Sequence, residues 1–262
     1  MQLPIYQVDA FASEIFRGNP AAVVPLTEWL PDALMLAIAA ENNLAETAFC
    51  IPTQEGYHIR WFTPELEMDL CGHATLAAAH VLWAHSGYTG QTIIFRSASG
   101  PLQVSKNGAW LTLDFPSRPP RPAAAPADLL AAMGGRPTQV LLARDYLLVY
   151  DTAAEVLALN PDPAAFQHFD LGTGGVIATA AGDDVDFVSR FFTPGASVFE
   201  DPVTGSAHCS LIPYWAERLG KTELSARQVS PRGGELRCRL RDGRVDISGR
   251  AITYLQGLIY LP

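Results

Sequence analysis

The sequence RWFTP at residues 60–64 is followed shortly by CGHAT at residues 71–75. The same order returns in the second half of the chain, where RFFTP at residues 190–194 precedes TGSAH at residues 204–208. Each copy has the pattern of an aromatic strand, a loop and the start of a helix led by glycine. Two echoes in the same order predict a duplicated fold rather than a chance resemblance.

A proline-rich segment separates the two copies. Residues 116–126, PSRPPRPAAAP, contain five prolines, which cannot continue a helix or a central strand. We therefore predict a first domain over residues 1–116, an extended linker over 117–127 and a second domain over 128–250. The last strand, within residues 251–262, packs either on its own half or back on the first domain, and we take the second placement as a hypothesis.

Short strands rich in aromatic and β-branched residues dominate both halves. Helices are few: one is expected over residues 31–43, with Pro31 at its first position. Another, over residues 72–85, is apolar almost all round, which is typical of a buried helix. The predicted fold class is α+β, with two pseudo-symmetric domains that are each a curled mixed β-sheet or barrel around a central helix. The strands are expected at residues 57–62, 91–95, 109–115, 146–150, 186–192, 235–240 and 244–247.

Composition excludes several classes of partner. The chain has 262 residues, 48% of them hydrophobic, which is enough to fill a core, and a net charge of −9. A nucleic acid or an anionic membrane would require a basic face, so neither is expected as a partner. No apolar run is long enough to span a bilayer, and the first residues do not resemble a signal peptide. Four cysteines at unrelated spacings are too few for a disulfide framework, and we expect a cytoplasmic protein.

The two repeated helix starts are the first candidates for chemistry. Gly72 and Gly205 let a ligand approach the backbone, and the amides of a first helical turn lack intrahelical partners. Together these features predict an anion site at each start. The competing interpretation, which stays open, is that both glycines only allow tight turns into buried helices.

Three polar residues near these starts are candidate acids or bases. His73 lies in the first turn of one helix, where the positive end of the helix dipole predicts a neutral imidazole. Asp201 precedes the other helix, and Glu46 stands where a helix meets an apolar strand. A desolvated Glu can hold or release a proton at neutral pH. The structural alternatives are that Asp201 caps a turn, that His73 is a satisfied core histidine and that Glu46, judged by position alone, is exposed.

Two other patterns are weaker. Cys71, His73, His208 and Cys209 could suggest zinc, but their spacing matches no usual zinc motif, so no metal is expected. The sequence GTGG at residues 172–175 resembles a dinucleotide loop. It leads into a β-rich run instead of a helix, so a turn is the better interpretation.

The motifs together resemble the PhzF-like (phenazine-biosynthesis isomerase-like) family. The resemblance implies two domains of the diaminopimelate-epimerase fold with the active site between them, a homodimer and no cofactor. It also implies an isomerase that moves a proton between ring carbons of a dihydro-hydroxyanthranilate. The motifs that carry the resemblance are VDAF at residues 8–11, FRGNPAAV at 16–23, LAETAF at 44–49, FTP at 62–64, CGHAT at 71–75 and DPVTGSAH at 201–208.

The resemblance also assigns roles to residues. Glu46 falls where the family has its general acid/base, and His73 and Asp201 fall on its supporting polar positions. The residues expected to bind a small carboxylate substrate are Gly72, Gly205, Ser206, Ala45 and Asn19.

Two rival functions remain from the sequence alone. A racemase or epimerase of the same fold would use two cysteines, but Thr204 stands where the second is required and Cys209 lies a helical turn further on. A binding or interaction protein could keep the fold without turnover, because a buried Glu46 can serve as a contact.

Overall fold

The structure is a computed structural model, and it describes residues 1–261 apart from 167, 168, 170, 173 and 195–197. The chain forms two compact units: unit 1 is Met1–Phe115 with Ile247–Pro262, and unit 2 is Pro116–Asp246. Both are built from curled mixed β-sheet with few helices, and the predicted α+β class is confirmed. Among the described residues, no helix is long and apolar enough to cross a membrane.

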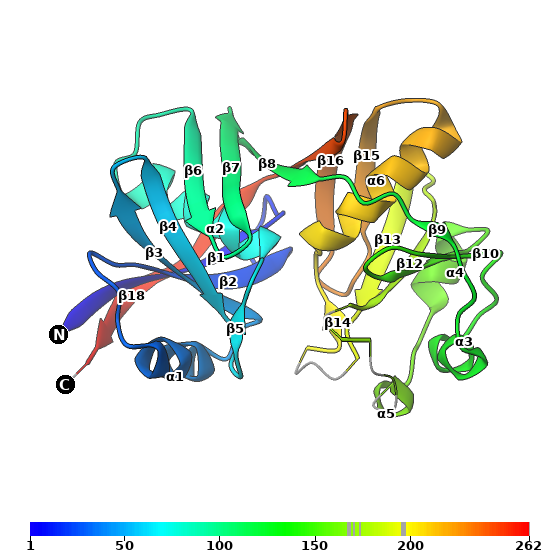
Figure 1. Ribbon diagram of the computed structural model, residues 1–262, viewed down its shortest axis with the longest axis horizontal. Helices are drawn as coiled ribbons and strands as arrows, with labels where there is room; N and C mark the ends of the chain where they lie inside the picture. Colours follow the sequence, from blue (N-terminus) through cyan, green and yellow to red (C-terminus); the bar gives the residue numbers. More distant parts are fainter. Residues whose placement is uncertain (167–168, 170, 173, 195–197, 262) are drawn as a thin grey trace. The chain divides into compact units, whose positions relative to one another are not determined.

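Unit 1 is a mixed sheet wrapped around one helix (Figure 1). Its ladder runs antiparallel from the last strand, β18, through β1 to β2, and then parallel from β2 to β3. β3 and β4 are antiparallel, β4 and β6 parallel, and β6, β7 and β8 again antiparallel. Its strands are β1 (Gln2–Ala10), β2 (Asn19–Pro25), β3 (Glu46–Thr53), β4 (Gly56–Phe62), β5 (Glu67–Met68), β6 (Thr92–Ser97), β7 (Gly100–Asn107), β8 (Trp110–Pro116) and β18 (Ala251–Tyr260).

The wrapped helix is α2 (Gly72–His85), which has the predicted bounds and is buried along most of its length. It packs against β1, β2, β3 and β18, because its small apolar side chains let the strands approach on every side. A second helix, α1 (Asp32–Asn42), packs against β3 and β4. The helix begins one residue later than predicted, so that Pro31 is its N-cap and not its first residue. Asn43 ends it in the left-handed conformation.

Unit 2 repeats the plan around α6 (Gly205–Leu219), which packs against β15 and β16. Three short helices were not predicted: α3 (Ala127–Met133), α4 (Ala153–Ala158) and α5 (Pro163–Phe166). The proline-rich linker was expected to be extended without being a central strand, and a short part of it pairs as β9 with β10, which proline allows at a sheet edge. The strands are β9 (Arg121–Pro122), β10 (Gln139–Leu142), β11 (Tyr146–Val149), β12 (Val176–Ala181), β13 (Phe187–Phe192), β14 (Glu200–Asp201), β15 (Glu223–Gln228), β16 (Gly234–Arg241) and β17 (Arg244–Gly249), which leads into unit 1.

The repeated RxFTP motif does the same structural work in both units. The Arg60 guanidinium binds the carboxylate of Glu67 on the short strand β5 through two hydrogen bonds of 2.7 and 2.6 Å. Arg190 binds Glu200 on β14 in the same way, at 2.7 and 2.8 Å. Each guanidinium also lies over the phenylalanine two residues later in its motif, 5.1 and 5.0 Å from the ring centre. The motif therefore holds a short returning strand in place before each helix start.

Candidate active site

Glu46 is the first residue of β3, a strand that is paired on both sides. β3 lies parallel to β2, with Glu46 opposite Ala21, and antiparallel to β4. The Glu46 side chain is 15% exposed, so the exposed placement favoured by position alone is wrong. The parallel pairing, which a local sequence pattern does not show, places this strand end beside the core.

The start of α2 brings two further side chains to Glu46. The Nε2 atom of His73 lies 3.1 Å from a carboxylate oxygen of Glu46. The two atoms do not meet at a hydrogen-bonding angle, and neither has a hydrogen bond within the described part of the chain. On the other side of the ring, Nδ1 of His73 lies 3.6 Å from Sγ of Cys71, the N-cap of the helix. The imidazole thus lies between a thiol and a carboxylate.

The electrostatics of this cluster correct the expectation of a neutral His73. Burial alone lowers the pKa of His73, but the neighbouring Cys71 sulfur and Glu46 carboxylate outweigh it, and the pKa lies well above 6.5. Burial and the nearby Glu46 raise the pKa of the Cys71 thiol, so the sulfur keeps its proton at neutral pH. Both neighbours raise the pKa of His73, the Cys71 sulfur more than the Glu46 carboxylate, and the raised pKa favours the imidazolium form of His73 beside Glu46.

The other predicted residues of unit 1 lie close by in the fold. Asn19 is fully buried at the start of β2, two residues before Ala21, so it points to the same face of the sheet as Glu46. Ala45 is half-buried and precedes Glu46 directly, and Gly72 is the first residue of α2. From the sequence, Cys71 is considered only as a zinc ligand or as one of two thiol bases, and not as a neighbour of Glu46, because no local spacing links the two residues.

In unit 2 the start of α6 is fixed by a hydrogen-bonded turn. The hydroxyl of Thr204 donates to the Asp201 carboxylate. The buried Gln228 side chain accepts from the Thr204 amide at 2.8 Å and donates to the Asp201 carbonyl at 2.7 Å. This geometry favours a turn-stabilising role for Asp201 as far as unit 2 alone is concerned. Gln228 was not predicted, since nothing in β15 marks it as a partner of a turn 24 residues earlier.

The helix behind this turn begins with Gly205, which is buried, and Ser206, which is half-buried. His208, one turn further on, pairs through Nδ1 with the Thr204 carbonyl at 2.8 Å, and burial lowers its pKa to about 4. His208 is therefore neutral at physiological pH, in contrast to His73. The GTGG segment precedes β12 as a non-helical connection, as expected, although its Thr173 is outside the described residues.

Only one group of metal-ligating side chains converges in the described part of the chain. Single ligand atoms of Glu46, Cys71 and His73 all lie within 4.8 Å of one another. This is not the set considered from the sequence, which combined Cys71 and His73 with His208 and Cys209 of unit 2. The converging set contains a carboxylate that no local spacing rule would have included.

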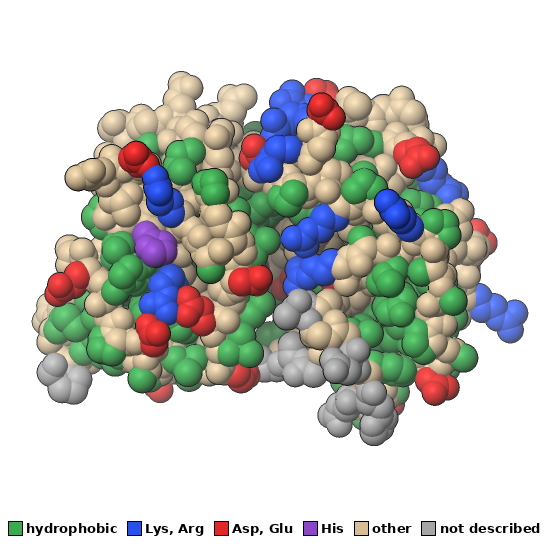
Figure 2. Space-filling view, in the orientation of Figure 1, with side chains coloured by type: hydrophobic (Ala, Val, Ile, Leu, Met, Phe, Trp, Pro, Cys, Tyr) green, Lys and Arg blue, Asp and Glu red, His purple; other side chains and the backbone are tan. Residues whose placement is uncertain are grey.

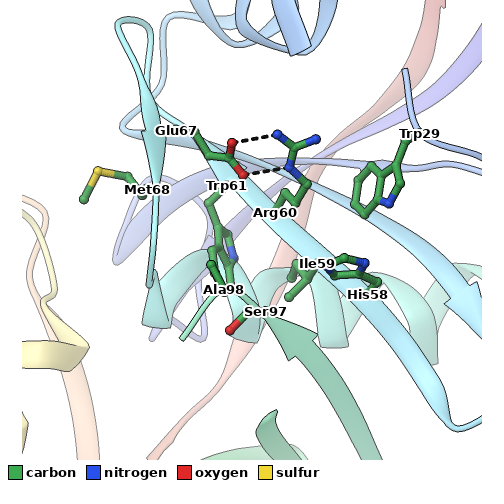
Figure 3. A pocket seen from close by; sticks show the side chains of 9 residues that line it. All are labelled: Trp29, His58, Ile59, Arg60, Trp61, Glu67, Met68, Ser97 and Ala98. Carbon is green, nitrogen blue, oxygen red and sulfur yellow. Dashed lines mark hydrogen bonds and ion pairs between the residues drawn. The ribbon is translucent and has the colours of Figure 1, made fainter. Parts of the chain in front are cut away.

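A separate cavity of about 290 Å³ opens on unit 1 (Figure 3). It is lined by Trp29, His58, Arg60 and Glu67 among others, and by none of the three clustered residues. The Arg60 guanidinium is already bound to Glu67 (Figure 3). It also binds Asp32 at 2.8 Å. In Figure 2, basic and acidic side chains accordingly lie side by side on this face of unit 1. Among the described residues that line the cavity, the one arginine is therefore already paired with carboxylates, and the cavity does not coincide with the cluster of Glu46, Cys71 and His73.

The sequence matches the family model described as "Phenazine biosynthesis-like protein" over residues 8–257. An uncharacterized isomerase of Pseudomonas aeruginosa is 51% identical over 261 residues, with both chains covered completely. The crystal structure of a PhzF-family phenazine biosynthesis protein from Enterococcus faecalis matches with a TM-score of 0.96 and 50% identity over the whole of both chains. A predicted epimerase from Pseudomonas aeruginosa, at 23% identity and a TM-score of 0.73 over 99% of this chain and 100% of its own, shares the fold.

Proposed function

The chain belongs to the phenazine biosynthesis-like family and is an isomerase, and we propose that it moves a proton between two carbons of a small, unsaturated carboxylate, with Glu46 as general acid/base. A ring of the dihydro-hydroxyanthranilate type fits this description, in keeping with the names of its relatives. The proposed reaction uses no cofactor: one C–H bond breaks, another forms, and no electrons leave the substrate.

The observation that carries the proposal is the Glu46–His73 pair at the start of α2. A mostly buried carboxylate 3.1 Å from an imidazole can take a proton from carbon, while the positive charge beside it offsets the charge that develops. The Glu46 oxygen removes the proton, the electron pair spreads over the conjugated system, and the same oxygen returns the proton to a second carbon. The charge of His73 stays beside the carboxylate throughout and thereby favours its ionised form between the two proton transfers.

Substrate binding is proposed at the helix starts. The first-turn amides that follow Gly72 and Gly205 have no intrahelical acceptors and suit a substrate carboxylate. Asn19, Ala45 and Ser206 are proposed as further contacts, and Asp201 as a residue that supports turnover.

A mechanism with two thiols is disfavoured. The Cys71 thiol has a raised pKa, and burial raises the pKa of Cys209 to about 12. Thr204, and not a cysteine, is the N-cap of α6, as Cys71 is of α2. Once turnover is found, it can be measured after treatment with a thiol alkylator and in Glu46→Gln. Turnover that is lost on alkylation but kept in Glu46→Gln would favour the two-thiol mechanism over the Glu46 mechanism.

The test is proton NMR in deuterated water with the phenazine-pathway dihydro-hydroxyanthranilate, carboxylated dienes and amino acids as substrates. We expect deuterium to enter one ring carbon with wild-type protein, and the rate to fall by at least about 100-fold in Glu46→Gln. Glu41→Gln, the same change on the exposed face of α1, is the control and should exchange normally. Exchange that persists in Glu46→Gln would show that another group is the base. Ligand binding without exchange in wild type would favour a binding protein.

A further inference from the structure

The side chains of Glu46, Cys71 and His73 differ in chemistry but converge on one point, because β3 and the start of α2 meet there. We propose that they form a binding site for a borderline-soft divalent cation, Zn²⁺ foremost, with one coordination position left open. A bound ion occupies the Glu46 and His73 atoms that would otherwise bind protons, so it acts as an inhibitor and not as a cofactor.

The geometry is close to that of a zinc site before the ion enters. The three ligand atoms lie within 4.8 Å of one another. Zinc bonds of about 2.0 Å to nitrogen or oxygen and about 2.3 Å to sulfur place tetrahedral ligands roughly 3.3 to 3.7 Å apart. Side-chain rotations that move each atom by about 1 Å close that difference. His73 and Cys71 are held by the first turn of α2, so two of the ligands need no backbone movement.

A second observation points to a ligand at the same place. The His73 side chain is 6% exposed, yet its Nε2 atom has no hydrogen bond among the described residues, and neither does the Glu46 oxygen that faces it. Buried polar atoms are rarely left in this state, because each one loses the hydrogen bonds that water would supply. A cation bound between them would use both of these atoms directly, and the Cys71 sulfur, which faces Nδ1 at 3.6 Å, would complete the set by rotation of its side chain.

The ligand set also selects the ion. Thiolate and imidazole bind Zn²⁺ in preference to Mg²⁺ or Ca²⁺, which favour sites made of oxygen alone. Binding transfers the thiol proton of Cys71 and the second imidazole proton of His73 to the buffer, and no electrons move. The partial exposure of Glu46 provides the route by which the ion reaches the cluster.

Binding is tested on the full-length protein after dialysis against a chelator, with Co²⁺ as the optical probe and Zn²⁺ as the competitor. We expect one Co²⁺ per chain, a thiolate-to-cobalt absorption band in the near ultraviolet, and displacement by Zn²⁺. Cys71→Ser should abolish the band and weaken Zn²⁺ binding by at least about 100-fold. Serine is a favoured N-cap residue, so this variant should keep α2 intact.

Two more variants complete the test. Glu46→Gln should weaken Zn²⁺ binding but keep the absorption band, because the thiolate remains. Cys50→Ala removes another buried thiol of unit 1, on the same strand as Glu46, and should bind Co²⁺ as wild type does. Lack of Co²⁺ binding by wild type, or equal binding by Cys71→Ser, would overturn the proposal.

The inhibitory part rests on the proposed function, whereas the binding part does not. With an exchanging substrate in hand, Zn²⁺ at a concentration that fills the site should stop deuterium exchange in wild type and Cys50→Ala alike. Cobalt binding with no substrate that exchanges would leave the metal site standing and count against the isomerase proposal alone. Exchange that continues at full occupancy would refute the inhibition.

Discussion

The Glu46–His73 pair makes a quantitative prediction about stability. Coulomb's law, with an effective dielectric constant of about 20, gives roughly 5 kcal/mol for unit charges at their 3.1 Å separation. Part of this attraction is offset by the loss of solvation of two mostly buried ions, and the angle between the atoms adds no hydrogen bond. We therefore expect a coupling free energy of about 3 kcal/mol while both groups are charged.

The coupling should depend on pH in a defined direction. The pKa of His73 is raised in the folded protein above its ordinary value of 6.5. The contribution of His73 to stability is thus fully present below pH 6.5 and is lost as the pH rises through its folded-state pKa. A double-mutant cycle of Glu46→Gln and His73→Gln, measured by urea unfolding at about pH 6 and about pH 9, gives the coupling in both states.

Two results would refute this reasoning. A coupling that is the same at both pH values would mean that the contact is between neutral groups, and a coupling that grows with pH would mean that the sign is wrong. Imidazole NMR of His73 provides an independent measurement, in which the pKa should fall when Glu46→Gln removes the carboxylate charge. An unchanged titration in that variant would assign the raised pKa to Cys71 instead.

Other groups allow further predictions. Burial lowers the pKa of His208 from 6.5 to about 4, so the unfolding free energy should fall by up to about 3 kcal/mol as the pH drops from 6.5 toward 4. In urea unfolding, His208→Asn should lose less stability over this pH range than wild type. An equal loss in both proteins would contradict the prediction. Glu200→Gln should cost about 3 kcal/mol of unfolding free energy and Glu67→Gln under about 1 kcal/mol, since their side chains are 16% and 39% exposed; equal costs would show that burial is not the cause. Burial raises the pKa of Asp145, whose Oδ1 accepts a hydrogen bond from the Gly175 amide at 2.8 Å. Asp145→Asn should therefore stabilise the protein by about 1 kcal/mol at neutral pH and lose this advantage in acid. A less stable variant at pH 7 would show that the charge is compensated.

Much of the fold could be predicted because its strongest signals are local. The helix at Gly72–His85 is apolar on all sides and begins at a glycine, and both features are visible in the sequence. The repeat at residues 60–64 and 190–194 identified the duplication, since each copy must hold a short returning strand. The short helix α4 could also have been found, because Thr152 and Glu155 form a capping box at its start.

The electrostatic state of the site could not be predicted in the same way. The field of a helix terminus, which alone predicts a neutral His73, is equivalent to about half a charge. Glu46 brings a full charge to within 3.1 Å, and it does so through the parallel pairing of β2 and β3, which no local pattern specifies. The residue roles, the homodimer and the cellular location stay predictions.

The duplication itself shows how the two units differ chemically. Phe62 and Phe192 are equivalent in the repeat, and they pair with Thr47 and Val176. Thr47 and Val176 are therefore equivalent, and so are the residues that precede them, Glu46 and Gly175. In the same way Met68 on β5 pairs with Trp61 of the first motif, and Asp201 on β14 pairs with Phe191 of the second, so Met68 corresponds to Asp201.

The helix starts differ as well, since Cys71 and His73 correspond to Thr204 and Ser206. The acid/base cluster of unit 1 thus has a glycine and two hydroxyls at the equivalent positions of unit 2. A mechanism with two matched bases would require a titrating group at both copies of one position, and none of these three positions provides it. A single carboxylate that both removes and returns the proton needs the cluster only once, and this asymmetry is the strongest internal argument for Glu46 as the one general acid/base.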